Sequence, residues 1–372
     1  MLESNNLYNW WKNIDKIILL IISLLFILGL FFSFVSTSFI ASDKLETNSY
    51  FFFIKHLIFV LIGSLILFIF SYLNKKTLIQ TSILFFIIFF IFLILVPFVG
   101  VEIKGSKRWI DIGSSLPRFQ PIELLKPFFI VLVSYFLLIN KNKNIYSNYL
   151  LNSILVIPTI FLLIAQPDIG QTTLISMIWL TVIFVSGVNL VIFFSFFAFF
   201  GLVISFLIIY IPKFIYIKKR ILSFFDPSTG NNYQSERALD AIINGGFFGR
   251  GMGEGKLNSI IPEAHTDYIV SVISEEFGAI ALILIMVLFL IFAYQVIKKM
   301  NAEKDEIFKL ILIGSVTLIL LQTFIHIGVN IRLLPTTGMT LPFLSYGGSS
   351  IISTSILSGI ILNITKRKVN QL

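Results

Sequence analysis

Long apolar runs separated by short polar connections dominate the pattern of this 372-residue chain. Their approximate bounds are 17–39, 54–72, 78–99, 122–139, 149–165, 172–188, 190–211, 268–297, 307–329 and 344–364. An α-helix needs roughly 20 apolar residues to cross about 30 Å of hydrocarbon, and the runs are close to that length. The pattern therefore predicts an all-α polytopic membrane protein with about ten transmembrane helices.

The distribution of basic residues predicts which side of the membrane each connection faces. Ten spans return the chain to its starting side, so both termini share that side. The basic residues in and beside the short connections of that side are Lys12, Lys16, Lys75, Lys76, Lys141, Lys143, Lys298, Lys299, Lys304, Lys366, Arg367 and Lys368. Because positively charged short connections stay inside, we expect cytoplasmic N- and C-termini. The uncharged turn at 186–189 is the weakest boundary, since its loss would place the C-terminus outside.

The longest connection, 212–266, then becomes a large extracytoplasmic loop between the seventh and eighth helices. With 57% hydrophobic and 13% charged residues, and a mean hydropathy of +0.94, the composition excludes a soluble protein. We therefore predict a single membrane domain over 1–372. The chain has no cysteine, which excludes disulfides, a thiolate nucleophile and a Cys-ligated metal.

The predicted outer loops are also rich in basic residues, within a net charge of +9. These residues include Lys104, Lys107, Arg108, Arg118, Lys213, Lys218, Lys219, Arg220, Arg237, Arg250, Lys256 and Arg332. A concentrated positive field on that face favours an anionic ligand. Solvated loop charges in contact with lipid headgroups are the alternative. No nucleic-acid partner is expected.

One aspartate stands at the mouth of a predicted membrane helix. If that helix begins near Thr266, then Asp267 shares one face with Ser271, Ser274, Glu275 and Gly278. A carboxylate is costly to place in hydrocarbon, so Asp267 is expected to face a cavity and serve a function or a buried pair. The alternative is a capping aspartate that complements the helix dipole at the water interface.

A second pair of charges lies inside a predicted span. Glu123 and Lys126 are one helical turn apart. Charges at this depth are expected to pair, and we predict a structural intramembrane ion pair in preference to a catalytic one.

The loop 212–266 has the signals of a folded lid. Residues 233–244 predict a short amphipathic helix that ends at Gly245 and Gly246. Alternating glycines follow over 249–255, without the strand or the Lys-Ser/Thr ending that nucleotide-binding glycine motifs require. Two interpretations of these glycines stay open: they present backbone N–H groups to a phosphate, or they form a flexible linker.

Several motifs together resemble the SEDS family (shape, elongation, division and sporulation). They are KRWI at 107–110, QPIELLK at 120–126, QPDIG at 166–170, PEAHTD at 262–267 and LPFLSYGGSS at 341–350. The segments YQSERAL at 233–239 and GRGMGEG at 249–255 are more similar to the division branch, FtsW, than to the elongation branch, RodA. Ile122 departs from the family, which usually has Ser after Gln-Pro, and this removes a hydroxyl there.

The resemblance implies a peptidoglycan glycosyltransferase that polymerises lipid II at the outer face of the bacterial cytoplasmic (inner) membrane, for septal wall synthesis. The family's essential aspartate corresponds to Asp267, which would act as the general base. Candidate substrate-binding residues are Lys107, Arg108, Trp109, Arg220, Arg250, His265 and Ser345, of which Lys107, Arg108, Arg220 and Arg250 are the candidate pyrophosphate contacts. No cofactor is required by the sequence; a divalent cation, Mg²⁺ or Mn²⁺, is the one that could assist, with unknown ligands.

The same resemblance implies partners: lipid II as substrate, a class B penicillin-binding protein transpeptidase, and other proteins of the division septum. Three alternatives remain open at this stage. The chain could be an elongation polymerase, a lipid II flippase, which would also use intramembrane ionisable residues, or a scaffold. A scaffold would need none of Asp267, Glu123 and Lys126.

Overall fold

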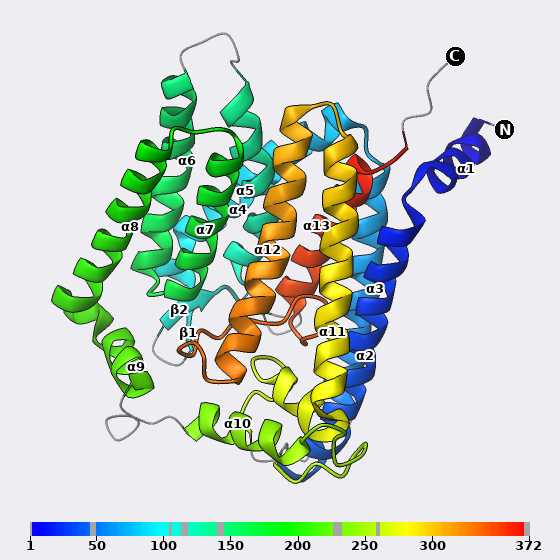
Figure 1. The fold of residues 1–372 in the computed structure, drawn as a ribbon, viewed down its shortest axis with the longest axis vertical. Coiled ribbons are helices and arrows are strands. Elements are labelled where there is room, and N and C mark those ends of the chain that lie inside the picture. The colour runs from blue at the N-terminus through cyan, green and yellow to red at the C-terminus, as the bar shows by residue number, and fades with distance from the viewer. Residues whose placement is uncertain are drawn as a thin grey trace.

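A computed structural model describes residues 2–44, 50–103, 106–111, 113, 118–139, 145–225, 233–257 and 261–367. Apolar helices run through the length of the molecule as a bundle, as Figure 1 shows. They are α2 (Lys16–Lys44), α3 (Phe51–Tyr72), α4 (Lys75–Val99), α5 (Pro121–Leu138), α6 (Ile145–Ala165), α7 (Ile169–Val185), α8 (Leu190–Tyr210), α11 (Ile269–Ala302), α12 (Glu306–Asn330) and α13 (Gly348–Ile364). Among the described residues, eight are long and apolar enough to span a membrane, and α7 and α13 are shorter apolar helices. Each predicted apolar run therefore contains a helix, in a multi-pass membrane protein.

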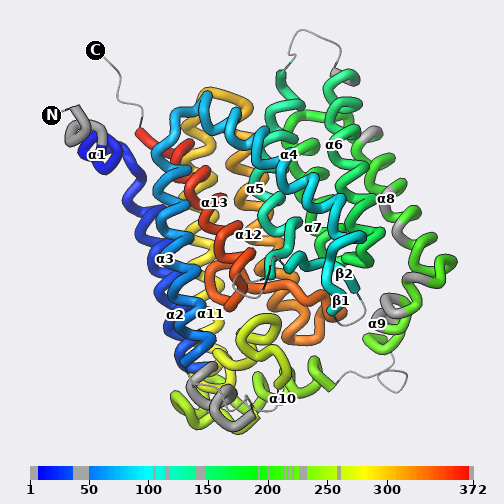
Figure 2. Tube along the Cα trace, turned by 180° about the vertical axis from the view of Figure 1, so that it is seen from behind, coloured from blue at the N-terminus to red at the C-terminus, as the bar shows by residue number. Residues whose placement is uncertain are grey.

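The remaining elements lie at the two ends of the bundle. They are α1 (Leu2–Asn13), β1 (Val101–Ile103), β2 (Ser106–Trp109), the 3₁₀ turn η1 (Pro212–Phe214), α9 (Ile215–Phe225) and α10 (Tyr233–Gly245). Helix α1 and the end of α13 lie at one end, whereas β1, β2, α9 and α10 lie towards the other (Figures 1 and 2). The predicted amphipathic helix at 233–244 is thus present as α10.

The β1–β2 hairpin departs from the all-α prediction. Its strands pair antiparallel, with Glu102 opposite Lys107 and Val101 opposite Trp109. Opposite charges and a β-branched–aromatic pair directly across two strands both stabilise such pairing. The two segments are only 3 and 4 residues long, too short for a periodicity signal.

Helices α3 and α13, far apart in the chain, lie side by side through small residues. A side-chain carbon added to Gly359 would lie 2.7 Å from the Leu67 carbonyl oxygen, and Gly63 of α3 meets Ser355 of α13 with no room for one. The Asn363 amide donates to the Phe70 carbonyl at 3.0 Å. Small residues that let two backbones approach closely are the usual means of joining helices in a membrane.

Candidate functional site

Asp267 lies in a turn immediately before α11, not on the helix. The carbonyl oxygen of Glu263 accepts the amides of Thr266 and Asp267, both at 3.1 Å, and closes a separate turn. The backbone of Tyr268, with φ −124° and ψ 26°, is not helical, so α11 begins only at Ile269, later than the predicted start near Thr266. Asp267 therefore does not share a helical face with the four later positions of the predicted stripe. Its side chain is half-buried.

The end of α12 holds the backbone of Asp267 in place. The Asn330 side-chain amide donates to the Asp267 carbonyl oxygen at 3.1 Å and to the His326 carbonyl at 2.8 Å. Its side-chain oxygen accepts from the Ser271 hydroxyl at 2.9 Å. Asn330 is fully buried, so these hydrogen bonds form away from water, where a polar group without a hydrogen bond is costly. The start of α11 is thereby locked to the end of α12.

The loop 331–347 covers the other side of this turn. A side-chain carbon on Gly338 would lie 3.6 Å from a carboxylate oxygen of Asp267, and Gly338 has a φ of 72°, which favours glycine. The Ser345 hydroxyl donates to the Thr266 carbonyl at 2.7 Å and accepts the Leu341 amide at 2.8 Å. Ser345 is 2% exposed, so contact with substrate, as predicted, would require this loop to open.

His265 extends the turn into an aromatic cluster at the start of α3. Its ring lies 4.6 Å from that of Phe52 and 5.8 Å from that of Tyr346, between centroids. Its carbonyl oxygen accepts the Tyr346 amide at 3.0 Å. Burial lowers the pKa of His265, which favours its neutral form.

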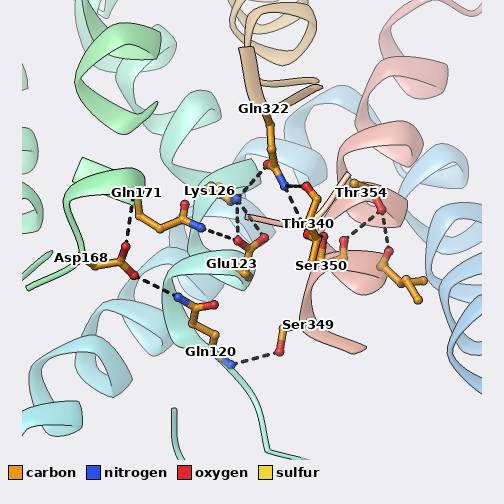
Figure 3. Close-up of polar contacts among 11 residues, drawn as sticks. Gln120, Glu123, Lys126, Asp168, Gln171, Gln322, Thr340, Ser349, Ser350 and Thr354 are labelled. Carbon is orange, nitrogen blue, oxygen red and sulfur yellow. Dashed lines mark hydrogen bonds and ion pairs between the residues drawn. The ribbon is translucent and has the colours of Figure 1, made fainter. Parts of the chain in front are cut away.

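A buried polar network lies within the bundle next to the loop 331–347 (Figure 3). The Lys126 ammonium lies 2.8 Å from the Glu123 carboxylate and donates to the Gln322 side-chain oxygen at 3.0 Å. The Gln171 amide donates to Glu123 at 2.6 Å. Lys126 is 1% and Glu123 5% exposed. The structure thus brings together the two charges predicted to pair and surrounds them with two amide side chains.

The network reaches the loop that borders Asp267. The Gln322 amide donates to the Thr340 carbonyl at 2.9 Å, and the Thr340 hydroxyl donates to that of Ser350 at 2.7 Å. Thr340 is two residues from Gly338, the neighbour of Asp267. A continuous set of contacts therefore joins the ion pair to the aspartate turn.

Arg108 points from the hairpin towards the start of α7. Its guanidinium lies 3.6 Å from the Asp168 carboxylate and donates to the carbonyls of Gln166, at 3.5 Å, and Pro167. Gln120 also donates to Asp168 at 3.2 Å. Burial raises the pKa of Asp168, against the lowering effect of Arg108. Arg108 thus ties together two motifs, besides any role towards an anion.

The other predicted basic and aromatic residues lie on different elements. Lys107 is exposed on β2, and Trp109 is half-buried at the end of the same strand. Arg250 is exposed and donates twice to Asn244, at 2.7 and 2.6 Å. Arg220 belongs to α9, and its side chain lies outside the described residues. The described contacts do not gather these side chains around Asp267.

The glycine-rich segment after α10 holds carboxylates of the protein itself. The Gly253 amide donates to the Glu276 carboxylate at 3.0 Å, and the Leu257 amide donates to that of Glu275 at 3.0 Å. Asn244 also donates to Glu275 at 2.9 Å. Glu275 is fully buried. This segment is therefore neither a plain linker nor, at the Gly253 amide, free for a phosphate; it binds α11 where Gly278, with a φ of 78°, interrupts the helix.

Three amide side chains near the site, those of Gln322, Asn330 and Gln171, were not among the predicted site residues. Gln322 and Asn330 lie at the middle and end of α12, and Gln171 lies in the first turn of α7. Amide side chains within apolar runs are the signal that could have identified them, because a polar group in hydrocarbon needs a partner. The described part of the chain has no cluster of three or more His, Asp or Glu residues that could hold a metal ion.

A family model for cell cycle proteins of the FtsW, RodA and SpoVE type matches residues 15–370. The chain belongs to this family. This is the SEDS family, so the resemblance of its motifs is confirmed. All the site residues described above lie within the matched part.

Relatives and a solved structure agree with this assignment. The chain is 37% identical over 346 residues to the probable peptidoglycan glycosyltransferase FtsW of Buchnera aphidicola subsp. Schizaphis graminum, covering 89% of this chain and 95% of the relative. It is 30% identical to the protein of the same name from Caulobacter vibrioides, covering 96% and 91%. It also matches a chain from a structure on the coordination of polymerization and crosslinking by a peptidoglycan synthase complex, with a TM-score of 0.77, 26% identity and coverage of 95% and 97%.

Proposed function

We propose that this SEDS-family protein is a peptidoglycan glycosyltransferase of the FtsW type, which polymerises lipid II at the outer face of the cytoplasmic membrane. The observation that carries the proposal is the setting of Asp267. Its carboxylate is half-buried in a turn that Asn330 and the loop 331–347 hold, beside a buried charged network. The relatives named as FtsW support the same activity.

The chemistry requires one base and one site for negative charge. The Asp267 carboxylate would take the proton from the acceptor sugar hydroxyl as the hydroxyl oxygen attacks the anomeric carbon of the donor. The bond from that carbon to undecaprenyl pyrophosphate breaks, and the pyrophosphate leaves with the bonding electrons. Positive side chains stabilise the departing charge. A rigid backbone at Asp267 keeps the base aligned, which is where Asn330 contributes.

The pyrophosphate contacts remain candidates, namely Lys107, Arg108, Arg220 and Arg250. A divalent cation, Mg²⁺ or Mn²⁺, would also suit this step. Mg²⁺ is commonly held by one or two carboxylates together with substrate phosphates, so a cation here would arrive with the pyrophosphate. It would neutralise charge on the leaving group.

The proposed activity sets the orientation in the membrane. We place all ten apolar helices across the bilayer, with both termini in the cytoplasm and 212–266 outside. Helix α1 and the end of α13 lie at one end of the bundle, and the start of α11, which Asp267 precedes, lies at the other, as this orientation requires (Figure 2). A class B penicillin-binding protein transpeptidase, with other septal proteins, is the proposed partner, since the matched structure describes polymerization together with crosslinking. The division septum is the proposed site of action.

The decisive experiment measures polymer formation in detergent. Purified full-length protein receives labelled lipid II and its transpeptidase partner, with the partner's own active site blocked. Asp267→Asn keeps the side-chain volume but cannot accept the proton, so polymer should be lost. The matched control is Asp240→Asn, an exposed carboxylate on α10 paired with Arg237 at 3.4 Å, which should retain activity. A folded Asp267→Asn protein that polymerises at the wild-type rate would refute the role of the base.

The same assay separates polymerase from flippase, because lipid II in detergent needs no crossing. Absence of polymer under every partner and cation condition, together with Asp267-dependent translocation in vesicles, would favour the flippase. Septal as opposed to lateral localisation of a fluorescent fusion distinguishes division from elongation.

A further inference from the structure

Helix α1 presents an apolar, aromatic face that the bundle does not cover. Leu7, Tyr8 and Trp11 are 53%, 63% and 53% exposed. Positions i, i+1 and i+4 lie on the same side of a helix, so these side chains form one face. The exposed stripe continues onto α2 at Ile17 and Leu20, which are 53% and 65% exposed. The face of α1 is therefore continuous with the lipid-facing surface of a membrane helix.

The side of α1 next to this face is fixed to the bundle. The Trp10 indole donates to the Ser71 hydroxyl at 3.0 Å, and its ring lies 4.9 Å from that of Phe68. The Arg367 amide donates to the Asn13 carbonyl at 2.9 Å and ties the end of α13 to α1. Figures 1 and 2 show α1 turning away from the line of α2 at the end where both termini lie. The orientation of its exposed face is thus set by contacts.

Three lysines belong to the segments that meet at this junction, and none has an acidic partner among the described residues. Among the described residues, no ion pair involves Lys12, Lys16 or Lys366, whereas the nearby Asp15 is taken by Lys299 at 2.6 Å. The Lys16 ammonium lies over the Trp11 ring, 3.1 Å from its centroid, which places a cation at the edge of the aromatic face. Burial lowers the pKa of Lys366 to about 8, because the charged ammonium loses part of its hydration.

We propose that α1, Lys12, Lys16 and Lys366 form a binding site for the headgroup of an anionic phospholipid. Leu7, Tyr8 and Trp11 lie among the headgroups and upper acyl chains, as the apolar face of an interfacial helix does. The lysines bind the lipid phosphate, whose negative charge is not offset by a cation in the headgroup of an anionic lipid. A zwitterionic lipid offers no net charge to three cations that lack an ion-pair partner among the described residues, so the site selects anionic lipid.

The test measures lipid retention by the purified full-length protein. Native mass spectrometry in detergent gives apparent affinities for phosphatidylglycerol and for phosphatidylcholine with the same acyl chains. The triple variant Lys12→Gln, Lys16→Gln, Lys366→Gln should bind phosphatidylglycerol more weakly, by roughly fivefold for each lysine at low salt. Phosphatidylcholine binding should stay unchanged.

The matched control removes equal charge at the same end of the molecule. Lys76, Lys298 and Lys304 are exposed lysines there, and their replacement by Gln should change phosphatidylglycerol affinity by less than about twofold. A thermal melt confirms that each variant is folded. Equal losses in the two triple variants, or equal affinity of the wild type for the two lipids, would overturn the proposal. Polymerisation is not measured, so this test is independent of the proposed activity.

Discussion

Breaking the buried pair of Glu123 and Lys126 should be far more costly than removing it whole. Glu123 is only 5% exposed. In Lys126→Met, its carboxylate keeps the Gln171 amide as its remaining described side-chain contact. Glu123→Gln leaves the ammonium with neutral amide oxygens, chiefly that of Gln322. Two unit charges 2.8 Å apart attract by about 6 kcal/mol at an effective dielectric constant of about 20, and burial removes much of that gain.

We therefore expect each single variant to lose about 3 to 5 kcal/mol of unfolding free energy. The double variant Glu123→Gln with Lys126→Met should recover at least about 2 kcal/mol relative to the sum of the singles, because no uncompensated charge remains. The measurement is a double-mutant cycle by denaturant titration in mixed micelles.

A matched control lies on α12. Glu306 and Lys309 have the same i, i+3 spacing and a distance of 2.9 Å, but their side chains are 50% and 30% exposed. The same substitutions there should cost less than about 1 kcal/mol, with a coupling near zero. Additive losses at the buried pair, or equal coupling at both pairs, would refute the reasoning that burial makes Glu123 and Lys126 interdependent.

Three further predictions test the surroundings of Asp267. Gly249→Ala should destabilise the protein by more than about 2 kcal/mol in thermal or denaturant unfolding, because its added carbon would overlap the α11 backbone. The control Gly246→Ala is also at positive φ but in open space, and it should cost only about 1 kcal/mol. Equal costs would contradict this reasoning. Burial lowers the pKa of His265, so the unfolded chain binds the proton first as the pH falls, and the free energy of unfolding should decrease below about pH 6.5. In melts at pH 7.5 and 5.5, His265→Gln should show a smaller decrease than the wild type, and an equal decrease would exclude the effect. Asn330→Ala should lower the polymerisation rate at saturating lipid II at least about tenfold by releasing the backbone of Asp267, and an unchanged rate in a folded variant would exclude this positioning role.

The helical framework was predictable because lipid imposes a simple rule. Every backbone group inside hydrocarbon must bond within its own segment, so apolar runs of sufficient length become helices. The amphipathic pattern identified α10, because a helix with one buried side repeats its apolar residues with the helical period. The pairing of Glu123 with Lys126 also followed from local spacing, since residues three apart share a helix face.

Contacts between distant segments were not predictable in the same way. The bond from Lys126 to Gln322 joins residues 196 positions apart, and no local period reports such a pair. The glycine-rich segment carries no local signal of its partner, although the amide of Gly253 donates to the carboxylate of Glu276. Helix α11 begins later than predicted because Tyr268, just after Asp267, has non-helical backbone angles that no local sequence period reports. The role of Asp267 itself came from the family motif and stays a prediction.

The close pairing of α3 with α13 also bears on how the protein is made. The bond between Asn363 and Phe70 joins residues 293 positions apart, so the partner of α3 is among the last segments to leave the ribosome. At 5 to 20 residues per second, α3 waits about 15 to 60 s in the bilayer with its small-residue face uncovered. During that interval insertion factors or membrane proteases compete with α13 for the same surface. A chain truncated before α13 should therefore be degraded, even though Asp267 and the Glu123–Lys126 pair have already been synthesised.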